Sequence, residues 1–157
     1  KDIMPKSLIF CDAIFEYRLL LKVRVVINKK MIRNFLIISC IGKDDKIGLK
    51  VDNKFYIHDI NQKVNKNDLL VSNILNLIKK HKVNIIDNFS ILVNNGPGSF
   101  SSIRVSLAVA KGIKISKNIN LFGFKNSDLG QFNLANIDLL IKKNMIQKNL
   151  IKPIYIS

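Results

Sequence analysis

The segment from Asn94 to Arg104 holds the residues whose types and spacing could support chemistry. It reads Asn-Asn-Gly-Pro-Gly-Ser-Phe-Ser-Ser-Ile-Arg and follows the apolar run 91–93 directly. Glycine tolerates positive φ and proline fixes φ, so Gly96, Pro97 and Gly98 predict a tight turn. A strand, a glycine-rich turn and a helix in succession can direct backbone N–H groups at an anion. Phosphate binding by the turn and nucleophilic attack by the serine after it are therefore the two chemistries to weigh.

Neither chemistry fits the residues in detail. A P-loop needs Gly-Lys-Ser/Thr after its glycines, and the segment 96–101 lacks it. The dinucleotide fingerprint needs a third glycine where Ser101 stands. A nucleophilic Ser99 needs a base, but His58 and His81 both precede it and neither belongs to a recognisable base motif. The sequence therefore predicts that Ser99 is the N-cap of a helix.

Metal and cofactor chemistry are not indicated either. Cys11 and Cys40 form no CxxC pair, and with two histidines they make neither a disulfide framework nor a zinc site. A two-metal nuclease needs clustered carboxylates, but the acidic residues after Met31 fall mostly in turns and at helix ends. We expect no metal, no cofactor and no catalytic residue.

The formal net charge of +15 suggests a nucleic-acid partner, but its source weakens that interpretation. The chain has 26 isoleucines, 22 lysines and 19 asparagines against 4 arginines, as a genome rich in A and T would produce. The lysines are spread along the chain with no RNA-binding motif between them. A basic RNA-binding module remains an alternative hypothesis. No run reaches about 18 apolar residues, so we expect no membrane span.

Hydrophobic periodicity predicts the elements that position the turn. Three short segments, 35–39, 47–51 and 54–58, predict an antiparallel meander. Two helices then alternate with two strands, and such crossovers lead to parallel strands. These four segments are the helix 67–81, the strand 89–93, the helix 101–117 and the strand 121–124. The order βββαβαβ predicts an α/β fold with a mixed sheet.

The pattern is weaker toward the C-terminal end. Ser127 could cap a short helix, Asp128–Asn136. The apolar stretch Ile137–Ile151 fits a helix or a strand, and Lys152–Ile156 predicts a closing strand.

The two predicted helices are apolar on more than one side. On the first, a stripe at i, i+4, i+7 and i+8 is widened by Leu69, Val71 and Leu75. Helices of this kind are deeply buried or have a partner. Arginine is rare in this chain, and the guanidinium of Arg104 suits a planar, bidentate contact to a carboxylate or phosphate. The predicted partner interface consists of Leu70, Ile74, Leu75, Leu77, Ile78, Arg104, Ala108, Val109 and Gly112.

Three short motifs resemble one family. Gly-Pro-Gly-Ser-Phe at 96–100, Ile-Arg at 103–104 and Ala-Val-Ala-Lys-Gly at 108–112 resemble TsaB (YeaZ), a Gcp-like protein of tRNA threonylcarbamoyladenosine synthesis. The similarity is strong over 94–123 and extends from 31 to 129. It implies a ribonuclease H-like, actin-like ATPase lobe with a structural glycine turn.

The resemblance also implies a function. A TsaB-like chain is a non-catalytic scaffold that pairs with its catalytic paralogue TsaD through the two helices of its first lobe. A TsaE-like ATPase joins them, and the complex modifies the adenosine beside the anticodon of tRNAs reading codons that begin with A. On this hypothesis contact with tRNA is indirect, the chain is cytoplasmic, and it forms a homodimer when alone.

Two departures limit the resemblance. Where the family has Asp-Thr-Ser in its first strand, this chain has Ile38-Ser39-Cys40, which removes the acidic residue. The stretch between Leu129 and Pro153 is much shorter than the family's second lobe, so that lobe is predicted to be largely missing. Residues 1–30 match nothing in the family and predict an N-terminal extension before a domain at 31–157. A divergent actin-like small-molecule kinase or ATPase is the other alternative.

Overall fold

The computed structural model describes residues 31–60 and 66–156. The chain divides into two units, Lys1–Met31 and Ile32–Ser157. The second unit contains every helix and strand that the structure describes. The predicted extension at 1–30 lies outside the described residues, so its boundary stays a prediction.

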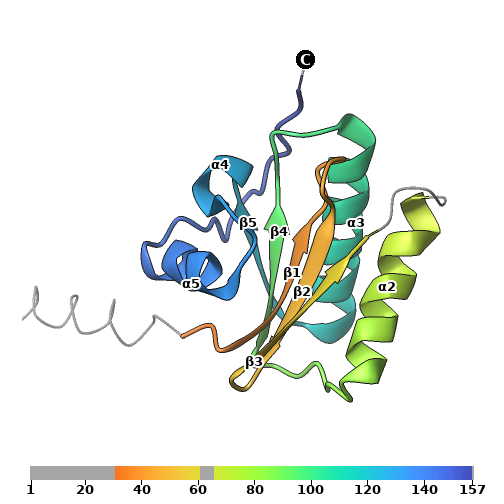
Figure 1. Ribbon diagram of the computed structural model, residues 1–157, viewed down its shortest axis with the longest axis vertical. Helices are drawn as coiled ribbons and strands as arrows, with labels where there is room; N and C mark the ends of the chain where they lie inside the picture. The colour runs from red at the N-terminus through yellow and green to blue at the C-terminus, as the bar shows by residue number, and fades with distance from the viewer. Residues whose placement is uncertain (1–30, 61–65, 157) are drawn as a thin grey trace, which may run out of the picture. The chain divides into compact units, whose positions relative to one another are not determined.

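One mixed five-stranded sheet forms the centre of this unit. In the order β3-β2-β1-β4-β5, the first three strands are antiparallel neighbours, and β4 and β5 continue parallel to β1 (Figure 1). The sequence therefore predicted the antiparallel meander and both crossovers correctly. The strands are β1 (Asn34–Ser39), β2 (Lys46–Val51), β3 (Lys54–Asp59), β4 (Phe89–Asn94) and β5 (Asn120–Phe124).

Helices cover both faces of the sheet. The long helices α2 (Lys66–Lys80) and α3 (Phe100–Lys117) lie on one face, and the short helices α4 (Asn126–Leu129) and α5 (Leu134–Lys142) lie on the other (Figure 1). Asn118 ends α3 in the left-handed conformation, with its N–H donating to the Lys114 carbonyl.

The central strands are buried on both faces. Their successive side chains point alternately to two hydrophobic cores, one on each face of the sheet. Leu36 and Ile38 of β1 pack in the core under α2 and α3. Phe35 and Ile37 pack with α5 in the other core. Every residue of β4 is buried as well. Continuous apolar runs of this kind are typical of parallel strands covered by helices on both sides.

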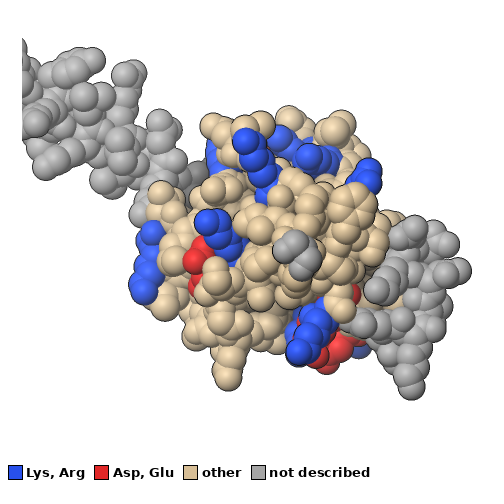
Figure 2. All heavy atoms as spheres, turned by 90° about the horizontal axis from the view of Figure 1, so that it is seen from above, with Lys and Arg blue, Asp and Glu red and all other residues tan. Residues whose placement is uncertain are grey.

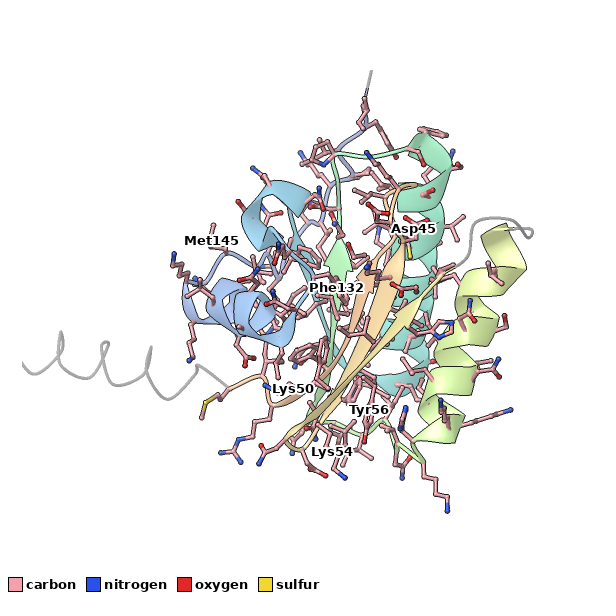
Figure 3. All side chains as sticks on the ribbon, viewed as in Figure 1. Asp45, Lys50, Lys54, Tyr56, Phe132 and Met145 are labelled. Carbon is pink, nitrogen blue, oxygen red and sulfur yellow. The ribbon has the colours of Figure 1, made fainter. Side chains whose placement is uncertain are left out.

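On the face of the unit that Figure 2 shows, charged side chains lie at several places. On the face that Figure 2 shows, the basic side chains stand in separate groups with uncharged surface between them. Lys50 has a structural role, because its Nζ lies 2.9 Å from Asp138 Oδ1 and 5.6 Å from the centre of the Phe35 ring. This half-buried pair ties β2 to α5 (Figure 3).

Within the described residues no helix is long and apolar enough to cross a membrane.

The prediction of a single helix over Asp128–Asn136 is wrong, because the helical conformation is interrupted within this range. α4 ends at Leu129, and Gly130 then takes a positive φ of 66°. α5 starts afresh, with Asn133 as its N-cap accepting a 2.8 Å hydrogen bond from the Asn136 N–H. Ser127 lies within α4 and caps nothing. The stretch 137–151 is helical only as far as Lys142.

The predicted closing strand Lys152–Ile156 is also wrong. It forms only one isolated bridge, between Tyr155 and Gly98, and its partner is the glycine turn rather than a sheet edge. Ile154 N–H donates to the Asn95 carbonyl at 2.7 Å, and Ile156 N–H donates to the Gly98 carbonyl at 3.1 Å.

We expect a variant that lacks residues 1–30 to fold on its own, because the described sheet begins at Asn34 and the described residues of both cores all follow Met31. Circular dichroism should show one cooperative thermal transition close to that of the full chain. Loss of a cooperative transition would mean that the first thirty residues are part of the fold.

Candidate functional site: the glycine turn and the outer face of two helices

The turn between β4 and α3 is the point where separate parts of the unit meet. Gly96 has a φ of 110°, and the Gly96–Pro97 peptide bond is cis. A Cβ on Gly96 would collide with the carbonyl oxygen of Ile154. A Cβ on Gly98 would lie 2.6 Å from Ile41 Cβ and 2.7 Å from its carbonyl oxygen. Gly96 is needed for its φ and for close approach, whereas Gly98, which has no positive φ, is needed for close approach alone.

The N–H groups of the turn are committed to the protein itself. Those of Asn95 and Ser99 donate to the carbonyls of Phe124 and Ile41, at 2.9 and 2.8 Å. That of Gly96 donates to the Asn94 side chain at 3.0 Å. The N–H of Gly98 donates to the carbonyl of Ile154, in the C-terminal segment, at 3.3 Å. The turn therefore offers no row of free donors to a phosphate, in agreement with the missing phosphate-binding motifs.

Ser99 occupies the N-cap position of α3. Its Oγ accepts from the Ser102 N–H at 3.4 Å and donates to the Ser102 Oγ at 2.8 Å. The two histidines of the chain line a separate groove between β3 and α2. This geometry gives Ser99 a structural part rather than a nucleophilic one.

The carboxyl end of the parallel strands carries amide and hydroxyl groups and one buried carboxylate, Asp45. Ligands of open α/β sheets bind outside this end. Asn94 Nδ2, at the end of β4, donates to Ser39 Oγ and to Asn126 Oδ1, both at 3.1 Å. Ile38 is fully buried. Among the residues that the structure describes, no three acidic, histidine or cysteine side chains come together to hold a metal ion. At the described end of the sheet the buried amide and hydroxyl groups thus bond to one another, and no carboxylate cluster forms among the described residues.

Cys40 follows β1 and is buried. The pKa of its thiol is raised from 9.0 to about 12, mainly by burial and also by the nearby Asp45 carboxylate, against a lowering by the hydrogen bond with Ser106. The thiolate is the reactive form of cysteine, so Cys40 is not a nucleophile near neutral pH.

The predicted partner interface separates into two groups in the structure. Leu70, Ile74 and Leu77 are buried in the core between the helices and the sheet. Ile78 and Val109 are half-buried against the same core. In the free protein these five side chains stabilise the fold. The exposed members of the predicted set are Leu75, Arg104, Ala108 and Gly112.

An outer face remains on α2 and α3, which lie side by side (Figure 1). Val71, Leu75 and Ile115 are 42%, 49% and 80% exposed. Nothing lies within 4 Å of the position that a Cβ on Gly112 would take, so this part of α3 is open. The prediction missed Ile115, although its spacing from Ala108 and Gly112, i, i+4 and i+7, was the available signal.

Arg104 lies near the N-terminal end of α3, close to the glycine turn. Its Cζ is 4.9 Å from the centre of the Phe100 ring, which in turn contacts Tyr155 at 4.8 Å between centroids. Both rings are exposed, and the guanidinium makes no ion pair with the acids that the structure describes. The bidentate contact predicted for Arg104 therefore stays a prediction about a partner.

The strand order and the two-sided helix cover define an α/β lobe of the actin-like, ribonuclease H-like kind. Comparison with solved structures agrees with this. The structure of YeaZ from Pseudomonas aeruginosa is similar with a TM-score of 0.54 and 17% identity. That of an uncharacterized protein with similarity to peptidase YEAZ, from the same organism, gives 0.51 and 18%. Both matches cover 61% of this chain and 44% of the other.

These likenesses establish the fold that the sequence motifs implied, over less than half of the related chains' length. No protein-family model matches the chain, and no curated protein matches it.

The turn leads to a prediction with a matched pair of substitutions. Gly98→Ala should destabilise the protein by about 1–3 kcal/mol, because the added methyl group meets the backbone of Ile41. Gly112→Ala should stabilise it by about 0.5–1 kcal/mol, because alanine favours a helix and the position is open. Urea unfolding measures both. Equal stability of the two variants would contradict the role given to the turn.

Cys40 allows a test of burial at the end of β1. In a Cys11→Ser variant, Cys40 is the one cysteine of the chain. We expect iodoacetamide to label it slowly in the folded protein near pH 8 and rapidly in urea, because burial keeps the thiol protonated. Mass spectrometry follows the reaction. Equally fast labelling in both states would show that this end of the sheet is open.

Proposed function

We propose that this chain is a TsaB-like, non-catalytic scaffold in tRNA threonylcarbamoyladenosine synthesis. It pairs with a TsaD-like enzyme, and a TsaE-like ATPase joins the complex. The observation that carries the proposal is the combination of a YeaZ-like fold with a glycine turn whose sequence resembles that family. Contact with tRNA runs through the complex, and the modified base is the adenosine beside the anticodon.

The chemistry of the described residues supports a scaffold rather than an enzyme. An actin-like kinase or ATPase places Mg²⁺ with an acidic residue on the first strand or its turn. In β1 the corresponding position holds the buried Ile38, and Asn94 Nδ2 donates to Ser39 Oγ. In the turn after β1 the buried Asp45 carboxylate accepts a 2.8 Å hydrogen bond from the Gly42 N–H. This arrangement favours the scaffold over the alternative of a divergent small-molecule kinase.

The outer face of α2 and α3 supports a protein partner. Val71, Leu75 and Ile115 expose apolar surface, and burial of such surface contributes about 25 cal/mol per Å². The small residues Ala108 and Gly112 permit close approach of another helix. Arg104 lies at the end of this face and is exposed, so its guanidinium can bind a carboxylate of the partner. We define the docking surface as Val71, Leu75, Arg104, Ala108, Gly112 and Ile115.

The distribution of charge gives less support to a dedicated RNA-binding module. Tight RNA binding by phosphate contacts uses lysines and arginines gathered on one surface. In the view of Figure 2 the basic groups are separated, and Lys46 and Lys50 are engaged with Asp59 and Asp138. The positive charge would serve a weak electrostatic attraction to tRNA held by the complex.

A pair of identical substitutions tests the docking surface. Leu75→Glu on α2 should abolish binding to the TsaD-like protein of the same genome, because it places a charge within the apolar contact. Leu139→Glu on α5 should leave binding unchanged, because Leu139 lies on the opposite face of the sheet with a similar exposure of 47%. Isothermal calorimetry with the purified partner measures both, and the thermal transition checks folding. Equal binding by the two variants would place the interface elsewhere.

A further inference from the structure

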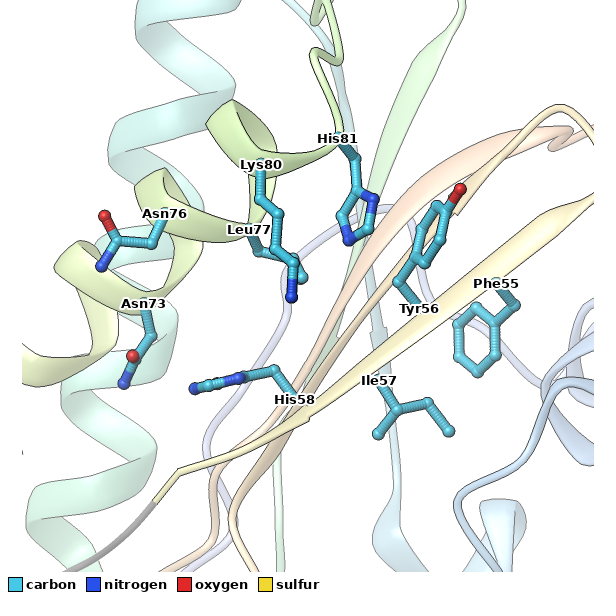
Figure 4. Close-up of a pocket in the computed structure, with 9 residues that line it drawn as sticks. All are labelled: Phe55, Tyr56, Ile57, His58, Asn73, Asn76, Leu77, Lys80 and His81. Carbon is cyan, nitrogen blue, oxygen red and sulfur yellow. The ribbon is translucent and has the colours of Figure 1, made fainter.

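A groove lies between the edge strand β3 and helix α2, apart from the docking surface and from the glycine turn. Its cavity volume is about 430 Å³, which is within the usual range for small-ligand sites. β3 supplies Tyr56 and His58 to it, and α2 supplies Asn73, Asn76 and Lys80 at helical spacing (Figure 4). β3 is the last strand on its side of the described sheet, so the groove is open along this edge.

The lining of the groove includes one lysine, two histidines and two asparagines, and none of its described residues is acidic. Both histidines of the chain line it. His81 stacks on Tyr56 with ring centroids 3.5 Å apart and planes 17° apart, which fixes one wall. In Figure 4 the Lys80 side chain extends from α2 into the space between His58 and this stacked pair. Lys80 makes no ion pair with the acids that the structure describes.

Lys80 and His81 lie at the C-terminal end of α2, where cations also serve to balance the helix dipole. The final carbonyls of this helix already have other partners. Lys82, with a φ of 52°, donates its N–H to the Lys79 carbonyl at 3.1 Å, and Val83 N–H donates to the Ile78 carbonyl at 3.0 Å. The backbone turn thus satisfies the helix end, and the Lys80 ammonium stays available to a ligand in the groove.

We propose that this groove binds a small molecule through a phosphate group. Lys80 supplies the positive charge, His58 and His81 supply ring N–H donors from opposite walls, and the Asn73 and Asn76 amides complete the polar contacts. An oxyanion with several acceptor oxygens satisfies converging donors of this kind, and charge-assisted hydrogen bonds are the stronger class. A localised hollow, rather than a basic stripe, favours a free phosphate ester over the backbone of a nucleic acid.

The two histidines make the site directly observable. The imidazole Cε1–Hε1 signals of the full chain, two in number, report on this groove alone. Inorganic phosphate and AMP are titrated at constant pH, with sodium chloride and adenosine as matched controls. We expect both signals to shift and saturate with phosphate and with AMP, and to stay in place with chloride and adenosine.

Two neighbouring lysines provide the variant and its control. Lys80→Ala should weaken phosphate binding about tenfold or more, the usual effect of a lost charged hydrogen bond. Lys79→Ala should bind as the parent does, because Lys79 is exposed on the same turn and does not line the groove. Alanine favours the helix at both positions, so both variants should fold.

Three results would overturn the proposal. The first is no saturable shift with phosphate or AMP, and the second is an equal loss of binding in the two variants. The third is a response to a short RNA without terminal phosphate, lost in Lys80→Ala, where free phosphate gives none. That result would assign the groove to an RNA backbone instead of a small molecule.

Discussion

The close approach of backbones at the glycine turn is the constraint on which the rest of the unit depends. Within a few residues the turn bonds to the loop after β1, the end of β5 and the C-terminal segment. Side chains at Gly96 or Gly98 would separate these contacts, since the neighbours are main-chain atoms that cannot move aside cheaply. The same bonds use up the N–H groups that a phosphate would need. One local geometry thus joins the sheet, starts α3 at Ser99 and removes the most obvious site for nucleotide chemistry.

The two long helices divide their apolar residues between two roles. The inward stripe of α2, including Leu70 and Ile74, completes the core over β1 and β4. The outward residues, such as Leu75 and Ile115, have no counterpart among the described residues that would cover them. A sheet face can bury only one side of a helix that lies on it. The surplus apolar surface is therefore what the fold leaves for another protein, and it is the physical basis of the scaffold proposal.

Much of the fold could be predicted from the sequence because its signals are local. Periodicity located all five strands and both long helices to within two residues at each end, and Gly-Pro-Gly-Ser marked the turn. The segment after Leu129 was predicted poorly, because Gly130 breaks the helix and the last residues bond to a distant turn. The site was predicted only in part: spacing reveals that a helix is apolar on several sides but not which side meets the sheet. The groove at β3 was not predicted at all, since His58 and Lys80 come together only through packing.

Hydrogen–deuterium exchange of the chain, alone and with the TsaD-like protein of the same genome, tests the central claim most directly. If the chain is a scaffold that docks through its outer helix face, peptides from α2 and α3 should gain protection on mixing. Peptides from α4 and α5, on the opposite face of the sheet, should exchange as before. Protection confined to α4 and α5, or no change in any peptide at concentrations where the partner is in excess, would contradict the account.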